Sequence, residues 1–326
     1  MAGALPPGWP PRERESSTLT DSVIDDDDDE HPKCSPCNRY RILVTPMFGM
    51  VIGIIGINYA PYVLWTPHAT WLSWVALAIF HVLLLLLFTS YLHCVLTDPG
   101  TVPQAWHDRI ASDPQLAARY RLCHRSGLYR PPRSHYCSVT GRVVLNMDHF
   151  CPWVINTVGY YNRKYFVLFL LYTLLTCSWV LATFVPTFLD VTTLAVKRSP
   201  VRRTIDGQRW SPSMYMVTWM AMLMDTTLVL MLLCFATFHL RMVLLNETTI
   251  EGPSPVFNVG KRKNWESVMG KNPTYWFLPL WGAGPNGDGV HWPTAPADGS
   301  GGSDGEHVCD NVHLLDSTCG SDSESV

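Results

Sequence analysis

The chain has 326 residues, of which 47% are hydrophobic, 16% are charged and 13 are tryptophan. The charges lie in blocks between long apolar runs, which is typical of a membrane protein and excludes a pair of ordinary soluble domains. A formal net charge of -3 disfavours nucleic-acid binding. Ten scattered cysteines disfavour a disulfide scaffold.

The sequence divides into two polar tails around an apolar body. Residues 1–41 are polar and partly acidic, which predicts a disordered tail. Four apolar segments follow, each long enough for a helix to cross a bilayer. They run roughly from Ile42 to Trp65, Trp71 to Leu96, Tyr165 to Leu189 and Met214 to Leu240. Only helices satisfy their own backbone hydrogen bonds in lipid, so we predict an all-α membrane protein with four transmembrane helices.

The predicted domains follow from these spans. Helices 1 and 2 occupy residues 42–96, and helices 3 and 4, with a lumenal loop, occupy residues 165–240. Residues 97–164 are too many for a simple connector and predict a small folded domain between the second and third spans. Residues 241–284 form a C-terminal segment, and the Gly-, Ser- and Asp-rich residues 285–326 predict a second disordered tail.

Basic residues predict the orientation in the membrane. The loop at residues 66–70 has no Lys or Arg, whereas the loop between the second and third spans has nine. By the positive-inside rule, the long loop and both termini are cytosolic. Five basic residues between Asp190 and Pro212 oppose this orientation, but the contrast of nine to none outweighs them. We expect a multi-pass protein of the Golgi, the endoplasmic reticulum or the plasma membrane.

The long loop carries three residues suited to covalent catalysis. Asp148, His149 and Cys151 lie within four consecutive positions. A thiol becomes a good nucleophile when it loses its proton, which an imidazole can accept while a carboxylate orients the imidazole. Fewer than 15 residues separate Cys151 from the third span. There a lipid chain can enter the bundle while its polar carrier stays in the cytosol, which suits chemistry on an acyl-CoA.

Residues Arg130 to Phe166 read RPPRSHYCSVTGRVVLNMDHFCPWVINTVGYYNRKYF. This segment resembles the cysteine-rich domain of the DHHC protein S-acyltransferases, or palmitoyltransferases, with Phe150 in place of the second histidine of the Asp-His-His-Cys signature. Other motifs of that family occur in order along the chain. They are Asp98-Pro99-Gly100 after the second span, Thr248-Thr249-Ile250-Glu251 after the fourth, and a C-terminal segment from Phe257 to Trp276.

The resemblance implies transfer of palmitoyl or another long-chain acyl group from acyl-CoA to cysteines of other proteins, through a thioester on Cys151. It implies that His149 is the general base and that Asp148 orients it. The supporting residues that it implies are Trp153 near the mouth of an acyl cavity, Thr248, Thr249 and Glu251 of the Thr-Thr-x-Glu motif, and Asn264 in the C-terminal segment. Candidate contacts to the phosphates of CoA are Arg130, Arg133 and Lys164.

The chain departs from the family at its two structural zinc sites, each of which would need three Cys and one His. The first set keeps one ligand of four and consists here of Cys123, Ser126, Tyr136 and Val143. The second also keeps one and consists of Cys137, Thr140, Phe150 and Thr157. One protein ligand does not make a structural site for tetrahedral zinc, so we predict that no structural zinc is bound.

Two interpretations of this loss remain open. Packing by Tyr136, Val143 and Phe150 replaces the metals in an active enzyme, or the protein is an inactive membrane scaffold of the same fold. Retention of all three catalytic residues favours activity. A transporter or channel would call for polar residues in several spans or for repeated halves. The spans hold one acidic residue, Asp225, and no internal repeat. The expected partners are the lipid bilayer, acyl-CoA and cysteine-containing substrate proteins.

Overall fold

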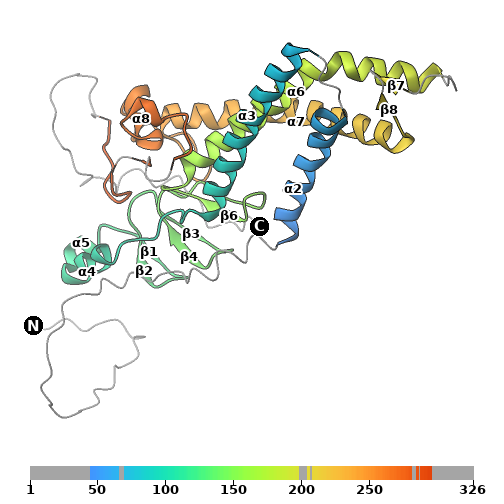
Figure 1. The fold of residues 1–326 in the computed structure, drawn as a ribbon. Coiled ribbons are helices and arrows are strands. Elements are labelled where there is room, and N and C mark those ends of the chain that lie inside the picture. Colours follow the sequence, from blue (N-terminus) through green and yellow to red (C-terminus); the bar gives the residue numbers. More distant parts are fainter. Residues whose placement is uncertain are drawn as a thin grey trace, which may run out of the picture. The chain divides into compact units, whose positions relative to one another are not determined.

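The computed structural model describes residues 45–65, 70–197, 204–205, 208–280, 284–285 and 287–295. In these ranges, four helical segments are long and apolar enough to cross a membrane. They are α2 (Pro46–Tyr59) continued by the π-helix η2 (Ala60–Trp65), α3 (Trp71–Leu96), α6 (Arg163–Lys197) and α7 (Pro212–Leu245) (Figure 1). The predicted fold class, a mostly helical protein with four spans, is confirmed. The predicted tail at residues 1–41 lies outside the described ranges.

Capping residues set where the spans begin. The side chain of Thr45 caps α2 and is followed by Pro46, which needs no hydrogen-bond acceptor for its nitrogen. A reciprocal hydrogen-bond pair between Thr70 and Ser73 begins α3. Ser211 caps α7, which ends at Asn246 with a left-handed φ of 55°. The membrane interior then favours continuous helices between these ends.

The third span is the most enclosed of the four. Within its most apolar window α6 is 44% buried, against 11% for α3 and 28% for α7. It packs against α3 on one side and α7 on the other. It therefore joins α3 to α7, while the first span, α2 with η2, packs against α7. The third span begins two residues before the predicted start at Tyr165, and it continues through Pro186.

The segment between α3 and α6 contains little regular structure. Two short helices, α4 (Gln104–Ser112) and α5 (Pro114–Ala117), precede three antiparallel hairpins. The hairpins pair β1 (Leu122–Cys123) with β2 (Leu128–Tyr129), β3 (His135–Cys137) with β4 (Arg142–Val144), and β5 (His149–Cys151) with β6 (Asn156–Val158). An isolated two-stranded hairpin is marginally stable in water, so each one depends on what it packs against.

The C-terminal segment packs against this loop region. It contains α8 (Lys261–Met269) and the 3-10 helix η3 (Pro273–Tyr275), while a fourth hairpin of β7 (Thr204–Ile205) and β8 (Gln208–Arg209) lies between α6 and α7. Val290 and Trp292 are buried in one apolar cluster with Trp106 and Tyr160. The prediction of disorder from residue 285 is therefore wrong for residues 287–295. Two apolar anchors suffice to hold a segment whose average composition is polar.

Candidate active site

The third hairpin of the loop carries the predicted nucleophile and base. His149 lies opposite Val158 and Cys151 lies opposite Asn156 in the β5–β6 pair. The side-chain amide of Asn156 donates to the carbonyls of Cys94, Val95 and Thr97 at distances of 3.1, 3.2 and 2.9 Å. These carbonyls belong to the end of α3, where helices leave carbonyls without partners. The hairpin is therefore fastened to the end of the second span.

Directly after the same hairpin, the backbone at Gly159 packs closely against Pro99 and Val144. A Cβ atom added to Gly159 would lie 2.7 Å from the carbonyl oxygen of Pro99 and 2.7 Å from Cγ1 of Val144. The backbone nitrogen of Tyr161 donates to the same Pro99 carbonyl at 3.1 Å. Because only glycine fits between these groups, the chain can pass directly from the hairpin into α6 beside the end of α3.

Asp148 is fully buried and held from two sides. Its Oδ2 accepts a hydrogen bond from Nδ1 of His149 at 2.8 Å, and its Oδ1 accepts one from the backbone nitrogen of Thr249 at 2.8 Å. The hydroxyl of Thr249 donates to the backbone carbonyl of Asp148. Burial by itself would raise the pKa of Asp148, but the hydrogen bond from His149 and the charge of Arg163 outweigh it. The pKa lies well below its usual range, so the carboxylate is ionised at neutral pH.

His149 links this carboxylate to Cys151. Burial by itself would lower the pKa of His149, but the hydrogen bond to Asp148 and the interaction with the side chain of Cys151 outweigh it and raise the pKa to about 9. Since Asp148 binds Nδ1, the other ring nitrogen, Nε2, is left to face the thiol. The three side chains can therefore move a proton from sulfur to imidazole and hold the resulting imidazolium.

Cys151 belongs to an apolar cluster to which all four spans contribute. It is 6% exposed, and the cluster includes Val51 of α2, Tyr91 of α3, Leu170 of α6 and Ala236 of α7. The sulfur of Cys151 thus lies where the polar loop meets the apolar bundle. An apolar chain attached to this sulfur would extend into the bundle and leave water.

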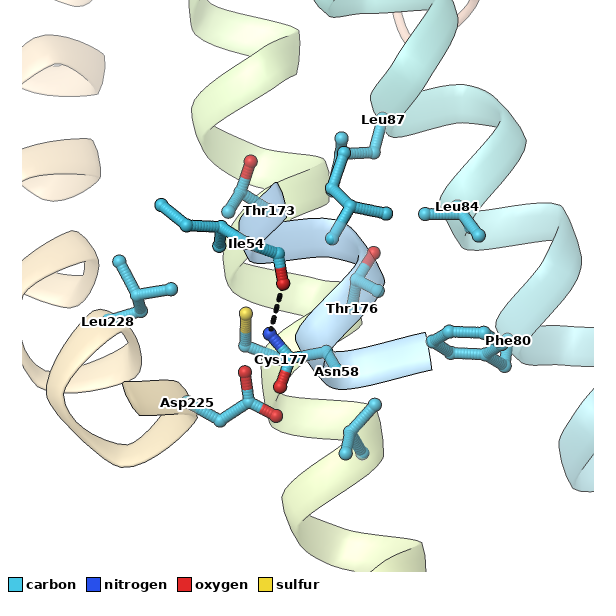
Figure 2. A pocket seen from close by; sticks show the side chains of 12 residues that line it. Ile54, Asn58, Phe80, Leu84, Leu87, Thr173, Thr176, Cys177, Asp225 and Leu228 are labelled. Atoms are coloured by element: carbon cyan, nitrogen blue, oxygen red, sulfur yellow. Dashed lines mark hydrogen bonds between the residues drawn. The ribbon is translucent and has the colours of Figure 1, made fainter. Parts of the chain in front are cut away.

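A cavity of about 60 Å³ lies deeper in the bundle, between α2, α3, α6 and α7. Figure 2 shows Asn58, Cys177 and Asp225 pointing toward one another at this cavity, whose other lining is mainly leucine, isoleucine and phenylalanine. Ile55 and Leu228 line the cavity and also pack against the cluster around Cys151. The cavity and the nucleophile therefore share one apolar wall.

The supporting residues lie around the site as follows. Trp153 is exposed, and its carbonyl accepts a hydrogen bond from the hydroxyl of Tyr91 at 3.2 Å. The hydroxyl of Thr248 accepts from the backbone nitrogen of Glu251 at 3.2 Å. The side chain of Asn264 donates to the carbonyl of Leu244 at 2.8 Å, which joins α8 to the end of α7.

The predicted CoA contacts differ in their surroundings. The side chain of Arg133 is buried and donates to Glu251 and Asn246. The ammonium of Lys164, which is also buried, donates to the carbonyl of Tyr275 at 2.7 Å. Arg130 is only half-buried. These internal contacts favour a structural role for Arg133 and Lys164 and leave Arg130 as the better candidate for a phosphate contact.

Two residues near Asp148 were missed by the sequence reasoning. Nη2 of Arg163 lies 4.0 Å from Oδ1 of Asp148 and also donates to the carbonyl of Glu247 at 2.5 Å. Nδ1 of His239, on α7, lies 3.8 Å from Oδ2 of Asp148. In the sequence, Arg163 was explained as one of the basic residues that orient the protein in the membrane. His239 lies in an apolar run and was explained as part of the fourth span. A histidine near the end of a span that adjoins the catalytic loop is the signal that could have found it.

Three residues at the second set of the family's zinc positions lie together around Cys137. Cys137 accepts a hydrogen bond from the hydroxyl of Thr157 at 3.2 Å, and Phe150 packs against the cluster that contains Cys137. Tyr136 lies opposite Val143 in the β3–β4 hairpin. Within the described ranges, no group of three or more His, Cys, Asp or Glu side chains could hold a metal ion. One thiol in each set does not fit tetrahedral zinc, and the absence of zinc stays a prediction.

Comparisons with known proteins agree with this geometry. A family model described as DHHC palmitoyltransferase matches residues 117–254. The probable protein S-acyltransferase 13 of Arabidopsis thaliana is 35% identical over 75% of this chain and 87% of its own length. The probable protein S-acyltransferase 12 of the same plant is 32% identical over 75% of this chain and 90% of its own. The palmitoyltransferase ZDHHC2 of Homo sapiens is 32% identical over 55% of this chain and 47% of its own length. The chain therefore belongs to the DHHC family of protein palmitoyltransferases.

Proposed function

We propose that this palmitoyltransferase carries the acyl group as a thioester on Cys151 between acyl-CoA and a cysteine of the substrate protein. The observation that carries the proposal is the position of Cys151, where His149 and Asp148 meet apolar residues of all four spans. A nucleophile for a lipid thioester needs both a base and a dry apolar surface beside it.

In the first step, His149 accepts the proton of the Cys151 thiol, and the sulfur attacks the carbonyl carbon of acyl-CoA. The new carbon–sulfur bond forms as the bond to CoA breaks, and the imidazolium returns its proton to the departing CoA sulfur. In the second step, the substrate cysteine attacks the acyl-Cys151 thioester in the same way and frees Cys151. One thioester replaces another, so the protein supplies positioning and proton transfer rather than a driving force.

The acyl chain would extend from Cys151 along α7. From Ala236, in the same cluster as Cys151, to Asp225 at the cavity is 11 residues, or about 16 Å at 1.5 Å per residue. This length is roughly one leaflet, half of the hydrocarbon core of about 30 Å. A long-chain acyl group therefore reaches the level of Asn58, Cys177 and Asp225.

The proposal also covers the orientation in the membrane, the need for zinc and the choice between an active enzyme and a scaffold. Residues 97–164 act as a cytosolic catalytic domain in an endomembrane or the plasma membrane, where acyl-CoA and protein cysteines meet. The basic loop favours that orientation. Structural zinc is not required, because each set of family ligand positions offers a single thiol. Since Asp148, His149 and Cys151 are all present and joined, we favour an active enzyme over a scaffold of the same fold.

Labelling of the purified, detergent-solubilised protein with alkyne-tagged palmitoyl-CoA tests the proposal. We expect a hydroxylamine-labile label on the wild type, no label on Cys151→Ser and little on His149→Ala. Cys234→Ser is the matched control, because Cys234 is an exposed cysteine of α7 outside the cluster around Cys151, and it should keep the label. A well-folded wild type without label would leave the scaffold as the better interpretation.

A further inference from the structure

A second histidine lies at the catalytic carboxylate. His239 is on α7, is 2% exposed, and places Nδ1 at 3.8 Å from Oδ2 of Asp148. The same oxygen accepts the hydrogen bond of His149 at 2.8 Å. The two imidazole rings have centroids 5.7 Å apart and planes tilted by 40°. One carboxylate oxygen of Asp148 therefore faces two ring nitrogens from different parts of the chain.

Three phenylalanines enclose His239. The ring centroids of Phe166, Phe235 and Phe238 lie 5.0, 4.5 and 5.4 Å from that of His239, each in an edge-to-face arrangement. Such a cage keeps the imidazole ring in one orientation and excludes water. The ring is thus aimed at Asp148 by apolar contacts that make no hydrogen bonds of their own.

The charges around His239 decide its protonation. In the described part of the chain, the charged and titratable groups that face its ring are Asp148, His149 and Arg163. Asp148 already faces the guanidinium of Arg163 and the imidazole of His149, which becomes a cation when it accepts the proton of Cys151. A further buried cation here would be repelled by both and would be desolvated by the phenylalanines. Desolvation and these cations disfavour a charge on His239, so its polar contact with Asp148 is the 3.8 Å approach of Nδ1 to Oδ2. The neutral tautomer with hydrogen on Nδ1 would direct that N–H at the carboxylate.

The contacts to Asp148 then form a symmetric set. Oδ1 faces the backbone nitrogen of Thr249 and the guanidinium of Arg163. Oδ2 faces Nδ1 of His149 and Nδ1 of His239. Rotation of the carboxylate about its bond to Cβ would break contacts on both sides. A carboxylate fixed in this way holds the ring of His149 with Nε2 toward Cys151.

We propose that His239 is a positioning residue for S-acyl transfer, whose neutral imidazole fixes the Asp148 carboxylate and, through it, the base His149. The inference rests on the proposed role of Cys151 and His149. It assigns to the fourth span an indirect part in the chemistry, through Asp148, beyond its contacts to the acyl chain. Its loss should slow acyl transfer without weakening the binding of acyl-CoA, because His239 acts on the base and not on the substrate.

Two substitutions separate positioning from packing. His239→Phe keeps a ring in the cage and removes the nitrogen, whereas His239→Asn places an amide N–H about where Nδ1 lies and loses the ring. For a positioning role, we expect His239→Phe to lower kcat for autoacylation roughly tenfold, as for a lost interaction with a charged group, and to leave KM for palmitoyl-CoA unchanged. His239→Asn should recover most of that loss. The opposite order, with His239→Phe active and His239→Asn impaired, would show a packing role and overturn the proposal.

The pH profile gives an independent readout. A loosely held Asp148 binds His149 less well, so the midpoint of the autoacylation rate should fall from about 9 toward the ordinary value of His near 6.5 in His239→Phe. In an Asp148→Asn background, the same substitution should add no further loss, since both act on one contact. If His239→Phe does not fold, His239→Leu replaces it with the same expectations. An unshifted midpoint in labelled, folded protein refutes the positioning role, while an unlabelled wild type refutes the proposed function itself.

Discussion

Replacement of Arg133 by methionine tests whether this arginine is structural or binds CoA. Its buried guanidinium donates to the side-chain and backbone oxygens of Asn246 at 2.7 and 2.8 Å and to Oε2 of Glu251 at 3.0 Å. It also lies 4.6 Å from the ring centroid of Phe257 and 4.5 Å from that of Trp292. Arg133 thus joins the loop to the end of α7 and to the C-terminal segment.

The expected cost follows from what Arg133→Met leaves behind. Burial by itself would raise the pKa of Glu251, but Arg133 and His135 outweigh it and hold that pKa at about 2. Removal of the arginine leaves a largely buried carboxylate with a weaker partner, which costs roughly 3–5 kcal/mol in other proteins. The two lost cation–π contacts overlap with this figure and are not added to it. At about 2–4 °C per kcal/mol, the unfolding midpoint should fall by roughly 10 °C.

Thermal unfolding of detergent-purified protein, read by size-exclusion chromatography after heating, measures this shift. Arg130→Met is the matched control from the same Arg-Pro-Pro-Arg segment, and its half-buried side chain should cost less than about 1 kcal/mol. If Arg130 contacts the phosphates, this control instead raises KM for palmitoyl-CoA. An Arg133→Met protein with the wild-type midpoint and a raised KM would refute the structural reading and restore Arg133 as a CoA ligand.

Three further predictions concern pH, packing and metal. The stabilisation from His149 is complete below its unfolded pKa near 6.5 and is lost as pH rises through about 9, so the stability difference between wild type and Asp148→Asn should shrink over this range; a constant difference in denaturation would contradict it. Gly159→Ala should destabilise by about 1–3 kcal/mol or more in thermal unfolding, because its Cβ would lie 2.7 Å from the Pro99 carbonyl; an unchanged midpoint would show that the backbone yields there. Elemental analysis of active protein should find well under one zinc per chain, and stoichiometric zinc lost together with activity on chelation would refute this.

The spans could be predicted because lipid leaves the backbone few choices. Apolar runs of sufficient length must be helices, and the four found match the four predicted. The predicted ends of the spans were less accurate where polar side chains are buried. Arg163 and Lys164 belong to α6, since their charged groups reach carbonyls of other segments instead of water. Trp292 shows the same limit at the C-terminus, where its apolar cluster with Trp106 and Tyr160 and its contact to Arg133 outweigh a polar composition.

The site could be predicted only where its residues are neighbours in sequence. Asp148 and His149 are adjacent, so their hydrogen bond follows from local geometry. Thr249 donates to Asp148 from about 100 residues away, and the resemblance to a family named it only as a supporting residue. His239 lies in the apolar run of α7, and the hydropathy of that run accounts for the segment as a membrane span without giving His239 a role. Its contact with Asp148 depends on how α7 packs beside the loop, which no local pattern contains.

The loop holds its shape through contacts to the spans rather than through a full set of metal ligands. Where the family would cross-link hairpins with zinc, the hydroxyl of Thr157 reaches Cys137 and Phe150 packs beside it. These contacts are weaker than metal coordination. The predicted catalytic residues are secured elsewhere, by Asn156 on the end of α3 and by Thr249 after α7. Loss of the metal ligands therefore reduces the rigidity of the outer hairpins more than the placement of the base, which is why a chain with one thiol in each zinc set can keep an organised catalytic site.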